Sequence, residues 1–433
     1  ITDKDGYQDY YGYQATYKTY NYSFGGAQAA ALAQNRIGNS RLEWESTTVT
    51  NFGVDAGFLN NRLTEELDVY NKVTDGILTT PNLHLTMGIK TPPTMNTAEV
   101  TNRGFELTVG WKDHVGDFNY AVSTNFSYNH NEVTKYLGKY EAGWVEKDGK
   151  KVWQSNIGDV SVDKDKGRIV EGHPIKEYYT LNTYSGNGTH FNSDGSVNIN
   201  GGPKDGMIRT EGDMKWLNAM IDAGYKFMPN QSVGRNNIYY GDLIYADLNG
   251  DGIYGSSYDY DFQGSSAMPK FGYGINISAS WKNFDLSMLW AGNGGFKLYW
   301  EEDPYNSVAI RNGFATSERV ANDHYFYDPE NPTDSRTNLN GYIPRLVENS
   351  KQSRQTSNYY LYNGTYMKLK NLTIGYTLPV TLTEKISAER VRVYLSGENL
   401  FTITSFPGQD PEMGATTNYP SLRQFAAGIS VTF

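Results

Sequence analysis

The sequence predicts an all-β protein, a transmembrane antiparallel β-barrel of which this chain forms about twelve strands. Three observations favour this class: apolar and polar residues alternate over several stretches, short turns alternate with long connections, and the last strand ends in an aromatic residue. Tyrosine accounts for 35 of the 433 residues and glycine for 45. Tyrosine favours strands and also the membrane–water boundary, where its ring is buried while its hydroxyl stays hydrated.

Composition and charge exclude several classes of protein. The formal net charge of -10, from 38 Lys and Arg against 48 Asp and Glu, argues against a nucleic-acid partner. The longest apolar run, Ala29 to Ala33, is far shorter than the roughly 20 residues of a membrane-spanning helix, whereas a strand crosses with about 9–11. Because cysteine is absent, disulfides, thiolate zinc sites, iron–sulfur clusters and cysteine nucleophiles are excluded.

Strands are predicted wherever every second residue is apolar. The stretches with this alternation, in chain order, are 51–58, 63–69, 105–111, 118–127, 271–281, the run from 284, 371–378 and 424–433. Short turns at 60–61, 113–117 and 282–283 join three pairs of these stretches into hairpins. The opposite face carries mostly Asn, Ser, Thr and Gly, with Glu65 as a break on the apolar side. Such faces suit a barrel with lipid outside and water inside.

The connections separate a membrane barrel from a soluble sandwich, whose strands also alternate. The long connections are predicted at about 77–98, 135–167, 182–238 and 301–357. Structureless loops longer than about 12–15 residues are uncommon in compact domains. Outer-membrane barrels, in contrast, have short periplasmic turns and long extracellular loops. The alternation of short and long connections therefore favours the barrel.

The last predicted strand ends flush with Phe433, the final residue of the chain. An aromatic residue in this place is similar to the signal that outer-membrane barrels present to their assembly machinery. An ordinary terminal edge strand can also end in an apolar residue, so this feature supports the barrel only together with the connections.

Several motifs occur in an order that resembles the RagA/SusC family of TonB-dependent transporters, in the outer membrane of Bacteroidetes. The motifs are Leu42-Glu43-Trp44-Glu45, Asn51-Phe52-Gly53-Val54-Asp55, Asn102-Arg103-Gly104-Phe105-Glu106, Gly172-His173-Pro174-Ile175, Gly241-Asp242, Asp247-Leu248-Asn249-Gly250-Asp251-Gly252, Pro269-Lys270-Phe271, Leu369 to Tyr376 and Ser396-Gly397-Glu398-Asn399-Leu400-Phe401. Each motif alone is weak, and their shared order carries the resemblance.

The resemblance implies a 22-stranded barrel filled by an N-terminal plug, with a TonB-contacting box before the plug. This chain would form the C-terminal part of that barrel, with residues 1–41 as an extracellular loop or strand segment and 42–433 as barrel. No signal peptide and no plug precede Ile1 in this sequence, so we expect a fragment or a processed product. The N-terminal portion is then expected as another segment or chain, because unpaired strand edges are costly in lipid.

An acidic stretch is a candidate calcium site. Asp247, Asn249 and Asp251, followed by Gly252, have the spacing of the first half of an EF-hand loop. Its twelfth position is Tyr258, and Asp259 is the candidate replacement ligand. The alternative is a turn rich in Asp, Asn and Gly that binds no metal. If Ca²⁺ binds, we expect it to stiffen an extracellular loop.

Aromatic residues in the long connections are candidate substrate contacts. They are Trp144, Trp153, Trp216, Tyr239 and Tyr240. Rings beside Asp and Asn side chains suit the recognition of sugars or peptides at an extracellular mouth, whereas the alternative is that they pack the loops together. Glu106 and Asp285 fall on predicted lumen faces.

No motif of a known catalytic centre occurs in the sequence. The phosphate-binding loop, the nucleophile elbow and the H-E-x-x-H zinc motif are absent, and the six histidines lack metal-binding spacing. We therefore predict that the protein is not an enzyme.

The resemblance implies active import of a bulky nutrient, an oligosaccharide or oligopeptide, across the outer membrane. The expected partners are a SusD-like surface lipoprotein, the plug-bearing portion of the transporter, TonB, and outer-membrane lipid. Two alternatives stay open: a passive porin or adhesin barrel, and a secreted all-β glycan-binding protein or glycosidase. The choice between glycan and peptide is beyond the sequence.

Overall fold

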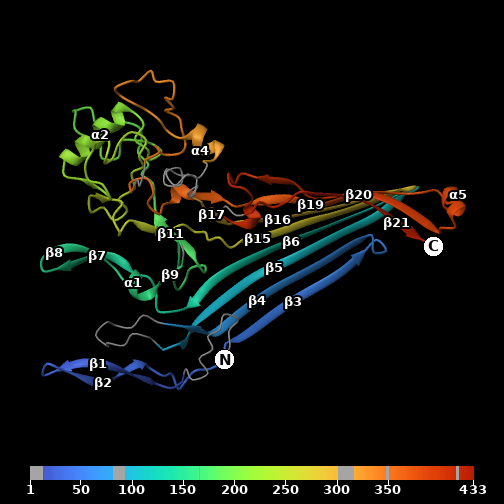
Figure 1. The fold of residues 1–433 in the computed structure, drawn as a ribbon, viewed down its shortest axis with the longest axis horizontal. Coiled ribbons are helices and arrows are strands. Elements are labelled where there is room, and N and C mark those ends of the chain that lie inside the picture. Colours follow the sequence, from blue (N-terminus) through green and yellow to red (C-terminus); the bar gives the residue numbers. More distant parts are fainter. Residues whose placement is uncertain (1–12, 81–92, 165, 301–315, 348–350, 416–418) are drawn as a thin grey trace.

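The computed structural model describes residues 13–80, 93–164, 166–300, 316–347, 351–415 and 419–433. Nine strands form one antiparallel sheet in the order β3-β4-β5-β6-β15-β16-β19-β20-β21 (Figure 1). Their bounds are β3 Ser46–Phe58, β4 Leu63–Thr79, β5 Met95–Val115, β6 Phe118–Lys135, β15 Phe271–Trp281, β16 Phe284–Gly294, β19 Tyr366–Thr377, β20 Arg390–Thr404 and β21 Gln424–Thr432. The order follows the chain, which makes the sheet a meander.

The pairing register separates an apolar from a polar face. Ile277 lies opposite Val122 on one side and Met288 on the other, while its neighbour Ser278 lies opposite Ala121 and Ser287. Side chains directly opposite each other share a face of the sheet. The register thus confirms the prediction from the sequence that the sheet has one apolar and one polar face.

Aromatic rings gather near both ends of the apolar face. Phe284 and Tyr376 lie beside the short turns, with ring centroids 4.7 Å apart. Near the other end, Phe271 lies 5.5 Å from Tyr128 and 6.0 Å from Phe126. Two aromatic bands flanking an apolar zone are typical of an outer-membrane barrel.

The short turns take left-handed backbone conformations that suit their residues. Asn60 and Asn61 have φ of 58° and 60°, and Gly116 has φ of 60°. Asparagine and glycine tolerate this region better than other residues. These turns and the C-terminus lie at one end of the sheet, and the long connections lie at the other (Figure 1).

The long connections fold into small elements instead of structureless loops. They are β7 Ala142–Lys147, β8 Lys150–Ser155, α1 Ile157–Val160, β9 Val162–Lys164, β10 Gly167–Ile169, β11 Glu177–Leu181, α2 Glu211–Asp222, β12 Lys226–Phe227, β13 Ile253–Tyr254, β14 Tyr260–Phe262, β17 Lys297–Tyr299, α4 Glu318–Asp323, η2 Asn358–Tyr360, β18 Leu361–Asn363 and η4 Pro411–Met413. Before β3, the strands β1 Thr16–Phe24 and β2 Ala27–Arg36 form a separate hairpin. At the turn end, α5 Val380–Thr383 and η3 Glu384–Ile386 join β19 to β20. Among the described residues, every helix is too short or too polar to cross a bilayer.

The structure differs from the sequence-based expectation in two respects. The large sheet has nine described strands instead of about twelve, because β1 and β2 pair only with each other and the remaining strands are short pieces within the connections. The connection predicted at 77–98 is shorter, since pairing continues past a bulge until Thr79 lies opposite Met95. Residues 81–92 and 301–315 of the predicted connections lie outside the described residues. The division at residue 41 stays a prediction.

A lysine introduced on the apolar face should destabilise the sheet in a membrane. We expect Ile277→Lys, near the middle of β15, to cost about 2–4 kcal/mol, as a lysine does at the midplane of a barrel. The matched control is Ser278→Lys on the polar face, with an expected change within about 0.5 kcal/mol. Denaturant unfolding of the full-length protein in lipid vesicles measures both. Equal destabilisation would contradict the assignment of the two faces.

Candidate functional site

The long connections enclose a hydrophobic core of their own, above one end of the sheet. We call this body the cap; it is built mainly from residues 181–260 and 320–360 (Figure 1). Helix α2 places Trp216, Leu217 and Met220 in the core, all fully buried. The helix begins at a capping box, in which the Thr210 side chain accepts the Asp213 amide and the Asp213 carboxylate accepts the Thr210 amide.

A buried ion pair holds two distant segments of the cap together. Asp242 is fully buried, and its Oδ2 lies 2.7 Å from Nη2 of Arg345. The Ser353 hydroxyl donates to the other carboxylate oxygen at 3.1 Å, and the Tyr239 amide donates to Oδ2 at 2.9 Å. Burial raises the pKa of the Asp242 carboxyl, and these donors together with Arg345 offset part of that rise. The charged form of Asp242 is therefore stable in the cap core only because of these partners.

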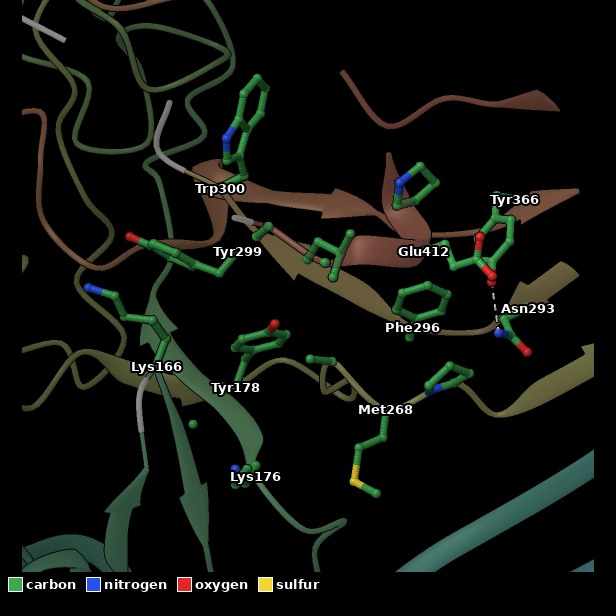
Figure 2. A pocket seen from close by; sticks show the side chains of 17 residues that line it. Lys166, Lys176, Tyr178, Met268, Asn293, Phe296, Tyr299, Trp300, Tyr366 and Glu412 are labelled. Atoms are coloured by element: carbon green, nitrogen blue, oxygen red, sulfur yellow. Dashed lines mark hydrogen bonds between the residues drawn. The ribbon is translucent and has the colours of Figure 1, made fainter. Parts of the chain in front are cut away.

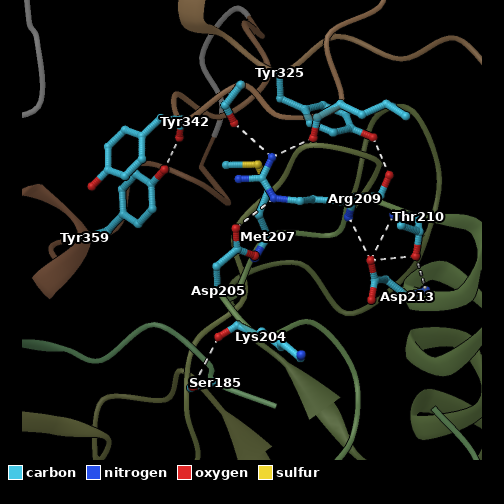
Figure 3. Close-up of polar contacts among 12 residues, drawn as sticks. Ser185, Lys204, Asp205, Met207, Arg209, Thr210, Asp213, Tyr325, Tyr342 and Tyr359 are labelled. Atoms are coloured by element: carbon cyan, nitrogen blue, oxygen red, sulfur yellow. Dashed lines mark hydrogen bonds and ion pairs between the residues drawn. The ribbon is translucent and has the colours of Figure 1, made fainter. Parts of the chain in front are cut away.

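Arg209 makes a second link between the same segments (Figure 3). Its Nε lies 2.7 Å from the Asp205 carboxylate, and its Nη1 donates to the Leu339 and Gly341 carbonyls at 2.9 Å each. Its guanidinium also lies 5.8 Å from the ring of Tyr325, whose hydroxyl donates to the Arg209 carbonyl. One guanidinium thus fixes the entry to α2 against the segment that follows α4.

A cavity of about 690 Å³ lies at the cap end of the polar face of the sheet, between β16, β19 and the neighbouring connections. We call it the mouth pocket. Side chains from five separate parts of the chain line it: Lys166, Tyr178, Met268, Phe296, Trp300, Tyr366 and Glu412 (Figure 2). Asn293 and Tyr366 lie opposite each other on the polar face of β16 and β19, and the Asn293 amide donates to the Tyr366 hydroxyl at 3.0 Å. The pocket therefore opens at the cap end of the predicted lumen.

The wall of the mouth pocket is rigid. Phe296, Leu298, Trp300 and Tyr366 are each less than 9% exposed and pack with Phe406 in one cluster. Strand β17, which carries Leu298, pairs with β18 and so fixes the spacing of these rings. The site is a preformed apolar wall that needs no rearrangement to accept an apolar group.

A group of ion pairs fastens the connection between β20 and β21 onto the pocket. The Lys368 ammonium is 1% exposed and lies 2.6 Å from the Asp410 carboxylate and 2.7 Å from that of Glu412. Lys370 also pairs with Glu412. Two cations and two anions balance, so the group adds no net charge beside the pocket.

Two of the predicted substrate aromatics, Trp144 and Trp153, lie together on the hairpin of β7 and β8. Their rings are 5.7 Å apart and nearly perpendicular, and the Trp144 Nε1 donates to the Asn249 carbonyl at 3.0 Å. Trp153 lines a second, more polar hollow of about 670 Å³ with Glu141, Gln154, Asp159 and Tyr258. These two rings stay candidates for solute contact.

The other three predicted aromatics are cap residues. Trp216 is fully buried and Tyr240 is 9% exposed, so the prediction that they offer a surface to a solute is wrong in this structure. Tyr239 packs edge-to-face on Tyr240 at 5.1 Å and lies 5.3 Å from the Arg345 guanidinium. Ring-to-ring packing inside the cap occupies these side chains, which is the alternative considered from the sequence.

The acidic stretch forms a closed turn through its own backbone. The Asp247 carboxylate accepts the amides of Gly250, Asp251 and Gly252, while Asn249 accepts that of Asp251. The Asp259 carboxylate instead accepts hydrogen bonds from the amides of Leu248 and Ser256, and burial raises the pKa of this carboxyl. Across the described residues, no three His, Asp or Glu side chains converge as metal ligands. These contacts stabilise the turn without a cation, and calcium binding stays a prediction.

Calcium binding by this turn has a direct test. If Asp247, Asn249, Asp251 and Asp259 bind Ca²⁺, thermal unfolding of the full-length protein shifts upward in calcium relative to EGTA, because a ligand of the folded state stabilises it. Asp247→Asn should remove that shift. An identical unfolding temperature in calcium and in EGTA would contradict the prediction.

Sequence reasoning missed the rings of the mouth pocket. Phe296, Leu298 and Trp300 follow β16, where every second residue is apolar, which is a local signal for a buried strand. The sequence could not tell that Tyr178 and Tyr366, far away in the chain, complete the same wall. The predicted lumen residue Asp285 is ion-paired to Arg392 at 2.5 Å, while Glu106 lies opposite Asp68.

Breaking the buried pair in the cap should loosen the cap selectively. We expect Asp242→Ala to destabilise it by about 3–5 kcal/mol, because Arg345 is left as an uncompensated buried charge. The control is Glu330→Ala, which removes the exposed pair with Arg235 and should change stability little. Limited proteolysis of the full-length protein, timed over increasing denaturant, measures cap opening. Equal protection of both variants would contradict the role assigned to Asp242.

Comparisons with known proteins place this geometry in context. No protein-family model matches the chain. It is 26% identical to the TonB-dependent receptor P3 of Formosa agariphila over 94% of this chain, and 25% identical to the TonB-dependent receptor SusC of Bacteroides thetaiotaomicron over 100% of it. The chain spans 36% and 37% of the lengths of these two curated relatives.

The fold is similar to that of solved transporters. A structure of the RagAB peptide transporter aligns with 98% of this chain at a TM-score of 0.64 and 22% identity, and 39% of that chain is covered. The open state of the RagAB peptide importer aligns at a TM-score of 0.65. The chain is thus SusC-like: its sequence is similar to those of TonB-dependent receptors, its fold is similar to part of their barrel, and it is an outer-membrane protein.

Proposed function

We propose that the full-length protein actively imports a bulky nutrient, an oligosaccharide or oligopeptide, across the outer membrane. The observation that carries this proposal is the mouth pocket, a preformed wall at the cap end of the polar face. A solute that enters the lumen at the cap end would pass this wall. The similarity to TonB-dependent receptors over almost the whole chain supports import rather than catalysis.

The remaining parts of the importer follow from the same likeness. A SusD-like lipoprotein would close over the cap from outside, and TonB would act on a plug in the portion of the protein that precedes this barrel segment. The polar face, with its Asn, Ser and Thr side chains, would give the solute a wet and weakly binding path. The solved RagAB structures are described as a peptide transporter, which makes oligopeptides a candidate cargo.

Dependence on TonB separates this proposal from a passive porin or adhesin. We expect that cells producing the full-length protein take up labelled nutrient, and that uptake falls to background when TonB is deleted or its contact box is removed. The control strain carries Glu330→Ala, a surface change outside the mouth pocket. Uptake that persists without TonB would overturn active import in favour of a passive pore.

The secreted alternative predicts a different purification behaviour. An outer-membrane importer should require detergent and copurify with its lipoprotein partner, whereas a secreted glycan-binding protein stays soluble without detergent. Isolation of the full-length protein from unboiled membranes, followed by mass spectrometry of the complex, distinguishes them. Recovery from the culture medium without detergent would count against the proposal.

A further inference from the structure

We propose that the mouth pocket binds an apolar side chain, aromatic or branched aliphatic, of an extended peptide. This inference rests on the proposed function, in which solute enters at this end of the barrel. It adds the chemical class of the solute, which neither the sequence nor the comparisons determine.

Two hydroxyl groups in the pocket wall, those of Tyr178 and Tyr366, are already engaged. The Tyr178 hydroxyl donates to the Lys297 carbonyl at 3.1 Å, and the Tyr366 hydroxyl accepts the Asn293 amide at 3.0 Å. What these two tyrosines present to the cavity is therefore mainly ring carbon. Phe296, Leu298 and Trp300 add further apolar surface.

The charges around the pocket are engaged as well. The Glu412 carboxylate pairs with Lys368 and Lys370, and the Lys166 ammonium lies 5.1 Å from the centre of the Tyr299 ring. A cation held over a ring is stabilised by the negative face of that ring. The wall is thus mostly carbon, and its charged groups are Lys166, Lys176 and Glu412.

This chemistry distinguishes a peptide side chain from a saccharide. A sugar unit carries several hydroxyls, and each one buried without a partner weakens binding roughly tenfold. An apolar side chain loses no hydrogen bond in this wall and gains from leaving water.

The size and edge of the cavity fit the same occupant. Pockets for small ligands measure about 300–1,000 Å³, and the 690 Å³ of the mouth pocket accommodates a large side chain with adjoining backbone. Met268 stands at the rim and is 48% exposed. Its flexible thioether can adapt to side chains of different shape.

Binding measurements on the full-length transporter in detergent test the inference. The probes are three pentapeptides with Phe, Leu or Gly at the centre of four glycines, and a neutral glucose pentasaccharide. We expect the Phe and Leu peptides to bind at least about tenfold more tightly than the Gly peptide, as burial of one such side chain predicts. The pentasaccharide should bind no better than the Gly peptide.

Two variants locate the effect in the pocket. Met268→Asp places a charge at the exposed rim and should abolish the preference for Phe over Gly without unfolding the protein. Leu248→Asp is the matched control, because Leu248 is 46% exposed in the cap but does not line the pocket. This control should keep the preference.

The outcomes separate this inference from the proposed function. Equal binding of the three peptides, tighter binding of the pentasaccharide, or a preference untouched by Met268→Asp would overturn the pocket assignment while TonB-dependent uptake still stands. Uptake that is independent of TonB would overturn active import, whatever the pocket binds.

Discussion

The pairing of backbone groups in the nine-strand sheet is the constraint on which the rest of the structure depends. Inside a bilayer no water is available to hydrogen-bond an open N–H or C=O, so every strand needs a neighbour on both edges. Seven of the nine strands have two partners, while β3 and β21 each have one among the described strands. The relatives are longer: this chain covers 36% of the TonB-dependent receptor P3 and 39% of a RagAB chain.

The cap is stabilised by different means than the sheet. Much of its backbone is irregular and lies between short elements. Side chains must therefore bind many of the buried backbone N–H and C=O groups that neighbouring strands would pair in a sheet. Asp242 and Arg209 do this by joining residues more than a hundred positions apart in the chain. The aromatic core around Trp216 then fills the space that these links enclose.

The sheet could be predicted from the sequence because its signal is local. Strict alternation located β15 and β21 to within a residue, the start of β16 was predicted at Phe284, and the turns between strands carried their own residue signals. Phase changes could not be predicted. In β19 a bulge at Lys370 shifts the register between Leu369 and Asn371, so even-numbered residues face the polar side before it and the apolar side after it. The burial of Trp216 likewise depends on contacts between residues far apart in the chain, and the periodicity of the sequence does not reveal such contacts.

That phase change brings the connection between β20 and β21 and the sheet into one site. Because of the bulge, Tyr366 and Lys368 both lie on the polar face, where Lys368 meets Asp410 and Glu412 of that connection. Without the bulge, an unbroken alternation through β19 would direct Lys368 toward the apolar side, where a lone ammonium is costly. The connection would then lose its anchor, and with it Pro411 and Gly414 of the pocket wall. The apolar pocket thus depends on a buried charge group, whose own position is set by one extra residue in a strand.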